Sequence, residues 1–140
     1  MWRDIERRAQ QHALPVPKTP VPYPLQNFDL ANKVGLVANN EGWYLEYLRE
    51  AYKVWFLEGK EAGSEQNLKD TLQNLSKNFY EAIEKSKEKA IDKEYISNTD
   101  EALNKGIFGA PSFSVGNEIF WGDDRLEDAI DFHGKTVKIN

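Results

Sequence analysis

Apolar side chains recur at intervals of three and four residues over most of this chain, a spacing that predicts amphipathic helices. Polar and charged residues fill the positions between them, so each predicted helix has one apolar face. The apolar positions of the six predicted helices are Trp2, Ile5 and Ala9; Leu30, Val34 and Val37; Trp43, Tyr44, Tyr47, Leu48, Ala51, Tyr52, Trp55 and Phe56; Leu68, Leu72 and Leu75; Phe79, Tyr80 and Ile83; and Ile91, Tyr95 and Ala102.

Polar residues at the edges of these stripes predict where the helices start and stop. Asn27, Ser64 and Ser76 each stand just before an apolar stripe, and we expect them to cap the helices that follow. Gly59 is expected to end the helix that carries the aromatic residues of positions 43–56. An aromatic stripe suits either a ligand platform or packing between helices, and we expect it to form core.

Residues 112–115 and 118–121 alternate between polar and apolar side chains, which predicts two strands. Between them Gly116 and Asn117 are expected to supply the pair of positive φ angles of a tight hairpin turn. A two-stranded hairpin is marginally stable by itself, so it is expected to pack on helices or on further strands.

A last helix is predicted to follow the hairpin. Asp124, with Glu127 three residues later, matches a capping box, and Gly134 is expected to close the helix. The order of elements is therefore several helices, one hairpin and one helix.

Five prolines between residues 15 and 24 separate the first two helices. Each proline ring fixes its own φ and restricts the residue before it, so we expect an extended, rigid connector that crosses the fold. A proline-rich ligand for another domain is the alternative.

Composition and charge exclude several classes of function. The 140 residues carry a formal net charge of −5, which works against a general attraction to nucleic acid or anionic lipid. No apolar run approaches the roughly 20 residues of a membrane-spanning helix, and residues 1–8 are too charged for a secretory signal. We therefore expect a cytoplasmic protein with no nucleic-acid or membrane partner.

The chain contains no cysteine, and its two histidines, His12 and His133, are far apart in the sequence. Thiolate metal sites, iron–sulfur clusters and redox chemistry by its own sulfur are thereby excluded, and we expect no metal site. Its chemistry must come from carboxylates, amides, hydroxyls, aromatic rings and backbone groups.

The most informative segment is Gly-Ile-Phe-Gly-Ala-Pro-Ser-Phe at residues 106–113. Pro111 stands directly before a predicted strand and follows the small residue Ala110. A cis peptide bond between them would turn the N–H and C=O of Ala110 outward, where they can pair with an extended, peptide-like ligand. An ordinary proline at the start of a strand is the alternative, because only about 5–6% of X–Pro bonds are cis.

With Phe-Trp-Gly-Asp-Asp-Arg-Leu at residues 120–126, this segment resembles the C-terminal half of the 2-hydroxychromene-2-carboxylate isomerases. Those enzymes belong with the kappa-class glutathione transferases in the thioredoxin-like superfamily, which includes the Dsb-type thiol oxidoreductases. Residues 1–9, the proline-rich connector, residues 52–56 and the segment Asn98-Thr99-x-x-Ala102 are also similar to this family, so the resemblance covers nearly the whole chain.

The resemblance implies an α/β fold, here mostly helical: the C-terminal part of a thioredoxin-like fold with an all-helical insertion domain. It assigns residues 1–26 to a remnant of the thioredoxin-like domain, residues 27–105 to the insertion and residues 106–140 to the C-terminal β-β-α portion. The family's N-terminal β-α-β portion, which carries an active-site serine, finds no match in these 140 residues. We therefore expect this chain to hold no catalytic residue and to be weak or inactive as an enzyme.

The resemblance also implies half of a glutathione site. The main chain of Ala110, held by Pro111, would pair with the cysteinyl part of glutathione. Asp123 and Asp124 would receive its γ-glutamyl end, and Arg125 stands at the place of a neighbouring arginine of the family. General electrostatics supports this, because a helix N-terminus attracts a carboxylate and an aspartate pairs with an ammonium group. A capping role alone is the alternative for the two aspartates.

The implied function is glutathione-dependent isomerisation of the 2-hydroxychromene-2-carboxylate type, or a kappa-like glutathione transfer. The ligands would be glutathione and a small aromatic or unsaturated acid, with Trp121 and Tyr23 as candidates for lining the acid's pocket. For Tyr23, packing in the core is the alternative. We expect a homodimer or other self-association, because unpaired strand edges would lie beside the hairpin. The alternatives are a Dsb-type oxidoreductase relative whose Cys-x-x-Cys is absent and a non-enzymatic helical interaction module.

Overall fold

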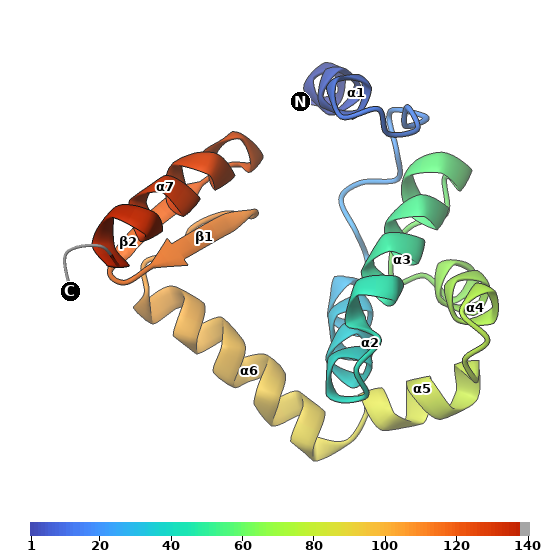
Figure 1. Ribbon diagram of the computed structural model, residues 1–140. Helices are drawn as coiled ribbons and strands as arrows, with labels where there is room; N and C mark the ends of the chain where they lie inside the picture. Colours follow the sequence, from blue (N-terminus) through green and yellow to red (C-terminus); the bar gives the residue numbers. More distant parts are fainter. Residues whose placement is uncertain (138–140) are drawn as a thin grey trace. The chain divides into compact units, whose positions relative to one another are not determined.

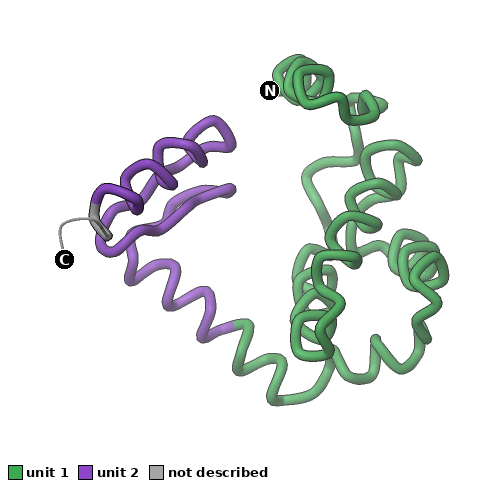
Figure 2. The backbone as a smooth tube through the Cα atoms, in the orientation of Figure 1, with its two compact units in different colours: residues 1–95 green, residues 96–140 purple. Residues whose placement is uncertain are grey.

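The computed structural model describes residues 1–137 and divides the chain into two compact units (Figure 2). Unit 1 is Met1–Tyr95 and unit 2 is Ile96–Asn140, and each is described by itself. The boundary falls inside one long helix. The three-part division expected from the sequence stays a prediction.

Unit 1 is built from the helices that the apolar spacing predicts (Figure 1). They are α1 (Trp2–Gln11), α2 (Phe28–Asn40), α3 (Tyr44–Glu58), α4 (Glu65–Asn74), α5 (Phe79–Ser86) and the first part of α6 (Lys89–Asn104). The helix carrying the aromatic stripe ends at Glu58 with Gly59 as its C-cap, as expected.

The main core of unit 1 lies between the apolar faces of α2, α3, α4 and α5, with Ile91 from the start of α6. Its fully buried side chains recur at helical spacing, and burial of such faces is the dominant favourable contribution to folding. The buried members of this cluster are Val34, Val37, Ala38, Trp43, Tyr47, Ala51, Leu68, Leu72, Ala82 and Ile91.

The aromatic stripe of positions 43–56 is only partly core. Trp43, Tyr47 and Trp55 are buried, which confirms the expected packing for these three. Tyr44 and Tyr52 are exposed, because a stripe of eight residues is wider than the face that α3 turns toward its neighbours. Tyr52 instead stacks on Phe56 at the surface, with ring centroids 5.8 Å apart.

The proline-rich connector crosses the surface of α3 and is packed against it. The indole N–H of Trp55 donates to the carbonyl oxygen of Pro22 (3.0 Å), and the backbone N–H of Lys18 donates to that of Phe56 (2.9 Å). Val21, only 4% exposed, completes a second apolar cluster with Trp55. The connector is thus part of unit 1, in agreement with the expected crossing loop.

Helix α4 carries two polar side chains into the core. Asn67 is fully buried and donates through Nδ2 to the carbonyl oxygens of Ala51 (3.2 Å) and Lys60 (3.1 Å). Ala51 lies in the middle of α3, and Lys60 lies two residues after its end. Thr71, one turn later, is also fully buried. Asn67 therefore ties α4 to the α3–α4 connection.

Of the three predicted N-caps, Ser64 and Asn27 occupy their expected positions and Ser76 does not. Ser64 Oγ accepts from the backbone N–H of Asn67 (3.2 Å), as expected of an N-cap. Asn27 occupies the N-cap position of α2, but no side-chain cap bond forms there. Ser76 was expected to cap α5, and this is wrong: Asn78 Oδ1 accepts from the backbone N–H of Glu81 (3.1 Å).

Ser76 has a different position because the preceding helix ends there. It has a positive φ of 55°, and its backbone N–H donates to the carbonyl oxygen of Gln73 (2.9 Å). The N–H of Lys77 then donates to the carbonyl oxygen of Leu72 (2.8 Å), which completes the end of α4. The next helix can begin only after this turn.

Unit 2 contains the end of α6, the strands β1 (Ser112–Val115) and β2 (Glu118–Trp121), the 3-10 turn η1 (Asp123–Arg125) and α7 (Leu126–Val137). The strands form the predicted antiparallel hairpin, with Ser112 opposite Trp121 and Phe113 opposite Phe120. Helix α7 packs on the hairpin through Ala129, which is buried, and through Phe132, whose ring lies 5.7 Å from that of Phe120.

Three details of unit 2 correct the sequence-based expectations. Only Gly116 has a positive φ (61°) in the hairpin turn, the pattern of a type II′ turn with glycine first, whereas a pair of positive angles was expected. The capping box does not form, because Asp124 lies inside η1 and Gly122 occupies the N-cap position. Helix α7 also runs on through Gly134 to Val137, since one exposed glycine lowers helix propensity without ending a helix.

Candidate functional site

The loop between α6 and β1 carries the first part of the candidate site. Helix α6 ends at Asn104, and the N–H of Ile107 donates back to the carbonyl oxygen of Ala102 (2.9 Å). The chain then passes through Phe108 and Gly109 to the Ala110–Pro111 peptide bond, which is cis, like Thr19–Pro20 and Tyr23–Pro24 in the connector. The hydroxyl of Ser112 donates to the carbonyl oxygen of Gly109 (2.6 Å) and closes this loop.

Ala110 presents its main chain to solvent. The residue is exposed, and within residues 1–137 neither its N–H nor its C=O has a hydrogen-bond partner. The flanking backbone is fixed, since the N–H of Gly122 donates to the carbonyl oxygen of Pro111 (3.0 Å). An extended peptide is the ordinary partner for an exposed, immobilised N–H and C=O beside a strand.

The same hydrogen bond brings the second part of the candidate site to this end of the hairpin. Gly122 lies opposite Pro111 and is followed directly by Asp123, Asp124 and Arg125 of η1, all of which are exposed. The backbone N–H of Arg125 donates to the carbonyl oxygen of Gly122 (3.2 Å), so the turn is tight. The predicted glutathione-site residues therefore gather at one end of one hairpin.

Charges at this end are mixed. Two carboxylates precede the guanidinium of Arg125, whose Nη1 lies 2.9 Å from Oδ2 of Asp128 one turn into α7. Carboxylates attract an ammonium group, while the guanidinium attracts a carboxylate. Such a surface suits the zwitterionic head of an amino acid.

Trp121 lies beside this surface, and the structure adds a partner that the sequence did not reveal. The rings of Phe108 and Trp121 lie 5.2 Å apart and are inclined at 59°. Both are exposed, by 74% and 55% respectively. Sequence reasoning missed Phe108 because a single aromatic residue in a loop has no periodicity. The available signal was its position two residues before Ala110.

Tyr23, the other residue expected at the acid's pocket, belongs to unit 1. It is 62% exposed, and its ring makes an edge-on contact with that of Trp2, with centroids 6.2 Å apart. A pocket shared by Tyr23 and Trp121 stays a prediction.

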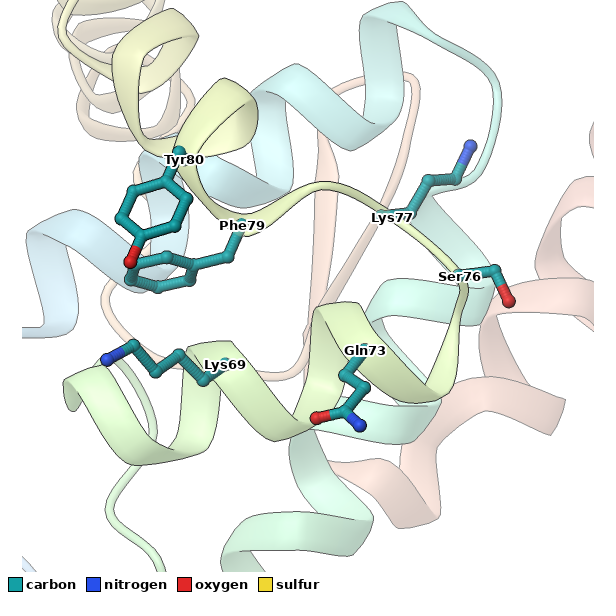
Figure 3. A pocket seen from close by; sticks show the side chains of 6 residues that line it. All are labelled: Lys69, Gln73, Ser76, Lys77, Phe79 and Tyr80. Carbon is teal, nitrogen blue, oxygen red and sulfur yellow. The ribbon is translucent and has the colours of Figure 1, made fainter.

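Unit 1 has a surface cavity of about 420 Å³ between α4 and α5 that the sequence did not predict (Figure 3). Phe79 and Tyr80 form one wall, with ring centroids 5.4 Å apart, and Lys69 reaches across from α4 with its ammonium group 5.4 Å from the centre of the Phe79 ring. Gln73, Ser76 and Lys77 complete the lining.

A network of charged and polar side chains in unit 1 surrounds Glu41. Lys85 Nζ donates to Glu41 Oε1 (2.6 Å) and to Glu81 Oε1 (2.6 Å), and the indole N–H of Trp43 donates to Glu41 Oε2 (2.7 Å). The bond from Lys85, followed by that from Trp43, holds the pKa of Glu41 below its ordinary value of 4.5. The bond to Glu41 in turn raises the pKa of Lys85.

Two kinds of site are not found in the described part of the chain. Within residues 1–137, no three histidine or carboxylate side chains gather as ligands for a metal ion. Over the same residues, no helix is both long enough and apolar enough to cross a bilayer.

Comparisons with known proteins extend this description. The chain is 26% identical over 128 residues to the 2-hydroxychromene-2-carboxylate isomerase of Sphingobium xenophagum, a match that covers 91% of this chain and 63% of the relative. It also matches a solved structure of selenomethionine 2-hydroxychromene-2-carboxylate isomerase with a TM-score of 0.79 at 21% identity, over 99% of this chain and 66% of the other. The chain thus spans about 63% of the length of the curated relative.

The likeness to the solved structure confirms the expected fold class, a mostly helical chain with the hairpin of a thioredoxin-like fold. The family model of the DSBA-like thioredoxin domain matches residues 1–131, nearly the whole chain. Helices α1 to α6, the hairpin, the loop before Pro111 and the first part of α7 lie within this match, and the chain therefore belongs to the family of DSBA-like thioredoxin domains.

Proposed function

We propose that this chain supplies the glutathione-positioning half of a glutathione-dependent isomerase of the 2-hydroxychromene-2-carboxylate type. The observation that carries the proposal is the unpartnered main chain of Ala110, fixed through Pro111 and Gly122 at the same end of the hairpin as Asp123–Arg125. The name shared by the curated relative and the solved structure supports the choice of reaction.

The residues at the hairpin end fit glutathione part by part. The N–H and C=O of Ala110 would pair with the main chain of the cysteinyl residue, as one strand pairs with another. The carboxylate of Asp124 would accept from the α-ammonium of the γ-glutamyl residue, while η1 and Arg125 would attract its α-carboxylate. Asp123 would share the ammonium contact.

Glutathione, when bound, would supply a thiolate that adds to the unsaturated acid and leaves again after rotation about the bond. This chain's own residues orient the tripeptide and the acid. The second ligand is accordingly a small aromatic or unsaturated acid, with Trp121 and Tyr23 as the proposed contacts.

Binding can be tested separately from turnover. In ¹⁵N-labelled 140-residue chain, millimolar glutathione should shift the amide signals of Ala110 and Asp124 in a saturable way. Cysteinylglycine, which lacks the γ-glutamyl residue, should shift Ala110 alone. Asp124→Ala should weaken glutathione binding by about tenfold, as expected for loss of a charge-assisted hydrogen bond. Glu118→Ala removes an exposed carboxylate at the far end of the hairpin and should leave binding unchanged.

Absence of any saturable shift would rule out the glutathione site and favour a non-enzymatic helical interaction module. Turnover is then tested by comparing isomerisation of 2-hydroxychromene-2-carboxylate, with and without glutathione, by the 140-residue chain and by a longer gene product. Strong turnover by the 140-residue chain would contradict the expected need for a serine outside it. Consumption of glutathione during the reaction would indicate a kappa-like transferase instead.

A Dsb-type thiol–disulfide oxidoreductase is the second candidate, because the family match is to a DSBA-like domain. It would need a cysteine pair, and these 140 residues contain no cysteine. A longer gene product carrying Cys-x-x-Cys and reducing a disulfide substrate would favour it over the isomerase.

Self-association and a cytoplasmic location are also proposed. Leu126 and Ile130 lie one turn apart on α7, and both are exposed, which supports a subunit contact. Gel filtration over a dilution series should show a dimer that dissociates at low concentration. A monomer at every concentration would contradict it.

A further inference from the structure

Phe108 and Trp121 are exposed, and for Trp121 the packing of α7 on the hairpin explains why. Adjacent residues of a strand point to opposite faces of the sheet, so Phe120 and Trp121 face opposite ways. The ring of Phe120 lies on that of Phe132, which shows that α7 covers its face. Trp121 therefore projects from the face that α7 leaves uncovered.

The indole of Trp121 is nevertheless held in place. It lies against Gly109, where a Cβ atom would overlap Nε1 of Trp121 and lie 3.0 Å from both Cδ1 and Cε2. The carbonyl of Gly109 is itself fixed by the hydroxyl of Ser112 (2.6 Å). Phe108 then meets the indole at an inclination of 59°. The two rings therefore meet at a corner whose outer surfaces face solvent.

Both residues of this corner are close in sequence to residues of the candidate glutathione site. Phe108 lies two residues before Ala110, and Trp121 directly precedes Gly122, which bonds to Pro111. An exposed aromatic ring attracts another planar ring either edge-on or stacked with an offset, with ring centroids typically about 4.5–7 Å apart. The corner therefore has the shape and the surface that recognise a planar arene.

We propose that Phe108 and Trp121 form an aromatic clamp that binds the planar ring of the acid substrate beside the glutathione half-site. This proposal rests on the proposed function and adds a specificity-determining residue, Phe108, to it. The clamp selects acids with a flat aromatic ring over saturated acids, because a flat ring can stack on one of the two rings and meet the other edge-on.

The clamp can be observed in the 140-residue chain labelled with 5-fluorotryptophan. The four tryptophans give separate ¹⁹F signals, and Trp121→Phe identifies the signal of Trp121. Titration with trans-cinnamate should shift this signal in a saturable way, whereas cyclohexanecarboxylate should not. Phe108→Leu keeps an apolar side chain without the aromatic face and should weaken cinnamate binding by about three- to tenfold.

Tyr80→Leu is the matched control, since Tyr80 is as exposed as Phe108 (74% for both) and lines the cavity of unit 1. It should leave cinnamate binding unchanged. If Tyr80→Leu weakens binding and Phe108→Leu does not, the acid binds in that cavity and the clamp is refuted. Gly109→Ala provides a second variant, because it displaces the indole and should weaken binding although Phe108 itself is not substituted.

The clamp and the proposed function can fail separately. If glutathione shifts the Ala110 amide while cinnamate leaves the Trp121 signal in place, the clamp is wrong and the glutathione site stands. If cinnamate shifts Trp121 and glutathione shifts nothing, the clamp stands as a site for aromatic acids and the glutathione proposal is wrong. If neither ligand has an effect, both proposals are wrong.

Discussion

The indole of Trp121 occupies the space that a side chain on Gly109 would need. A methyl group at Gly109 would overlap Nε1 of the indole and lie 3.0 Å from two of its ring carbons. The loop before Pro111 and the end of β2 approach each other this closely because residue 109 has no Cβ. The position of the exposed aromatic corner thus depends on a residue without a side chain.

Gly109→Ala should therefore push the indole of Trp121 outward and destabilise unit 2 by about 1–3 kcal/mol, as overpacking does elsewhere. The displacement is measured from the ¹⁹F signal of Trp121 and the destabilisation from urea unfolding. Gly134→Ala is the control, since nothing lies near its Cβ position in α7. It should stabilise the helix by about 0.5–1 kcal/mol. Equal effects of the two substitutions would contradict the steric argument.

Asn78, rather than Ser76, should prove to be the cap of α5. Asn78→Ala removes the side-chain acceptor of the Glu81 N–H and should lower the free energy of unfolding by about 1 kcal/mol. Ser76→Ala should have little effect, because Ser76 makes no cap bond to α5. Ser76→Gly should stabilise the chain, since residue 76 has a positive φ. A larger loss for Ser76→Ala than for Asn78→Ala, measured by urea unfolding, would restore the sequence-based assignment.

Asn67 should be the most sensitive polar position of α4. Asn67→Ala leaves the carbonyls of Ala51 and Lys60 without their side-chain donor inside the fold and should cost about 1–3 kcal/mol. Asn74→Ala, on the same helix, removes an exposed bond to Glu50 and should change stability by less than about 0.5 kcal/mol. Comparable denaturation midpoints for the two variants would show that the buried bonds contribute little.

The ion pair of Glu41 and Lys85 should make stability depend on pH in the acidic range. The pKa of Glu41 is lower in the folded chain than its ordinary value of 4.5, so the folded state binds fewer protons there than the unfolded state. This contribution is present above the ordinary value and is lost as the pH falls through the folded-state pKa. Glu41→Gln should therefore lower Tm near about pH 7 and match the unsubstituted chain at pH values below the folded-state pKa of Glu41, where this carboxyl is protonated in both states.

Glu84→Gln serves as the control for that comparison. Glu84 pairs with Lys87 on α5, but its side chain is 75% exposed, and exposed pairs of this kind contribute little. Its Tm should follow that of the unsubstituted chain at every pH. A pH-independent difference between Glu41→Gln and the unsubstituted chain would mean that shape rather than charge explains the effect.

The sequence predicted the helices and the hairpin because their apolar periods are long and regular. Leu68 and Leu72 are buried one turn apart, as their spacing required, and Phe113 and Phe120 face each other across the hairpin. The exact residues at which the helices begin and end were harder to predict. Ser76 and Asn78 are both good caps by residue type, and only the turn that ends α4 decides between them.

The candidate site was predicted as a set of residues, and the hairpin register brings the ones in unit 2 together. Ala110 and Asp124 are distant in sequence, and the bond between Pro111 and Gly122 joins their segments. Phe108 was not predicted, because its role depends on the side-chain direction of Trp121, which a sequence pattern does not contain. Tyr23 was a candidate for the pocket only as an aromatic residue, and the structure places it, exposed, in unit 1.

Two hydrogen bonds join the proline-rich connector to α3. The connector is therefore a packed part of unit 1 and not a flexible linker. A deletion that removed residues 1–24 would strip the acceptor from the Trp55 indole and the donor from the Phe56 carbonyl. It would also expose the apolar surface that Val21 covers. The helices from α2 onward should consequently be less stable as an isolated fragment. The shortest stably folded form of unit 1 should include the proline-rich connector.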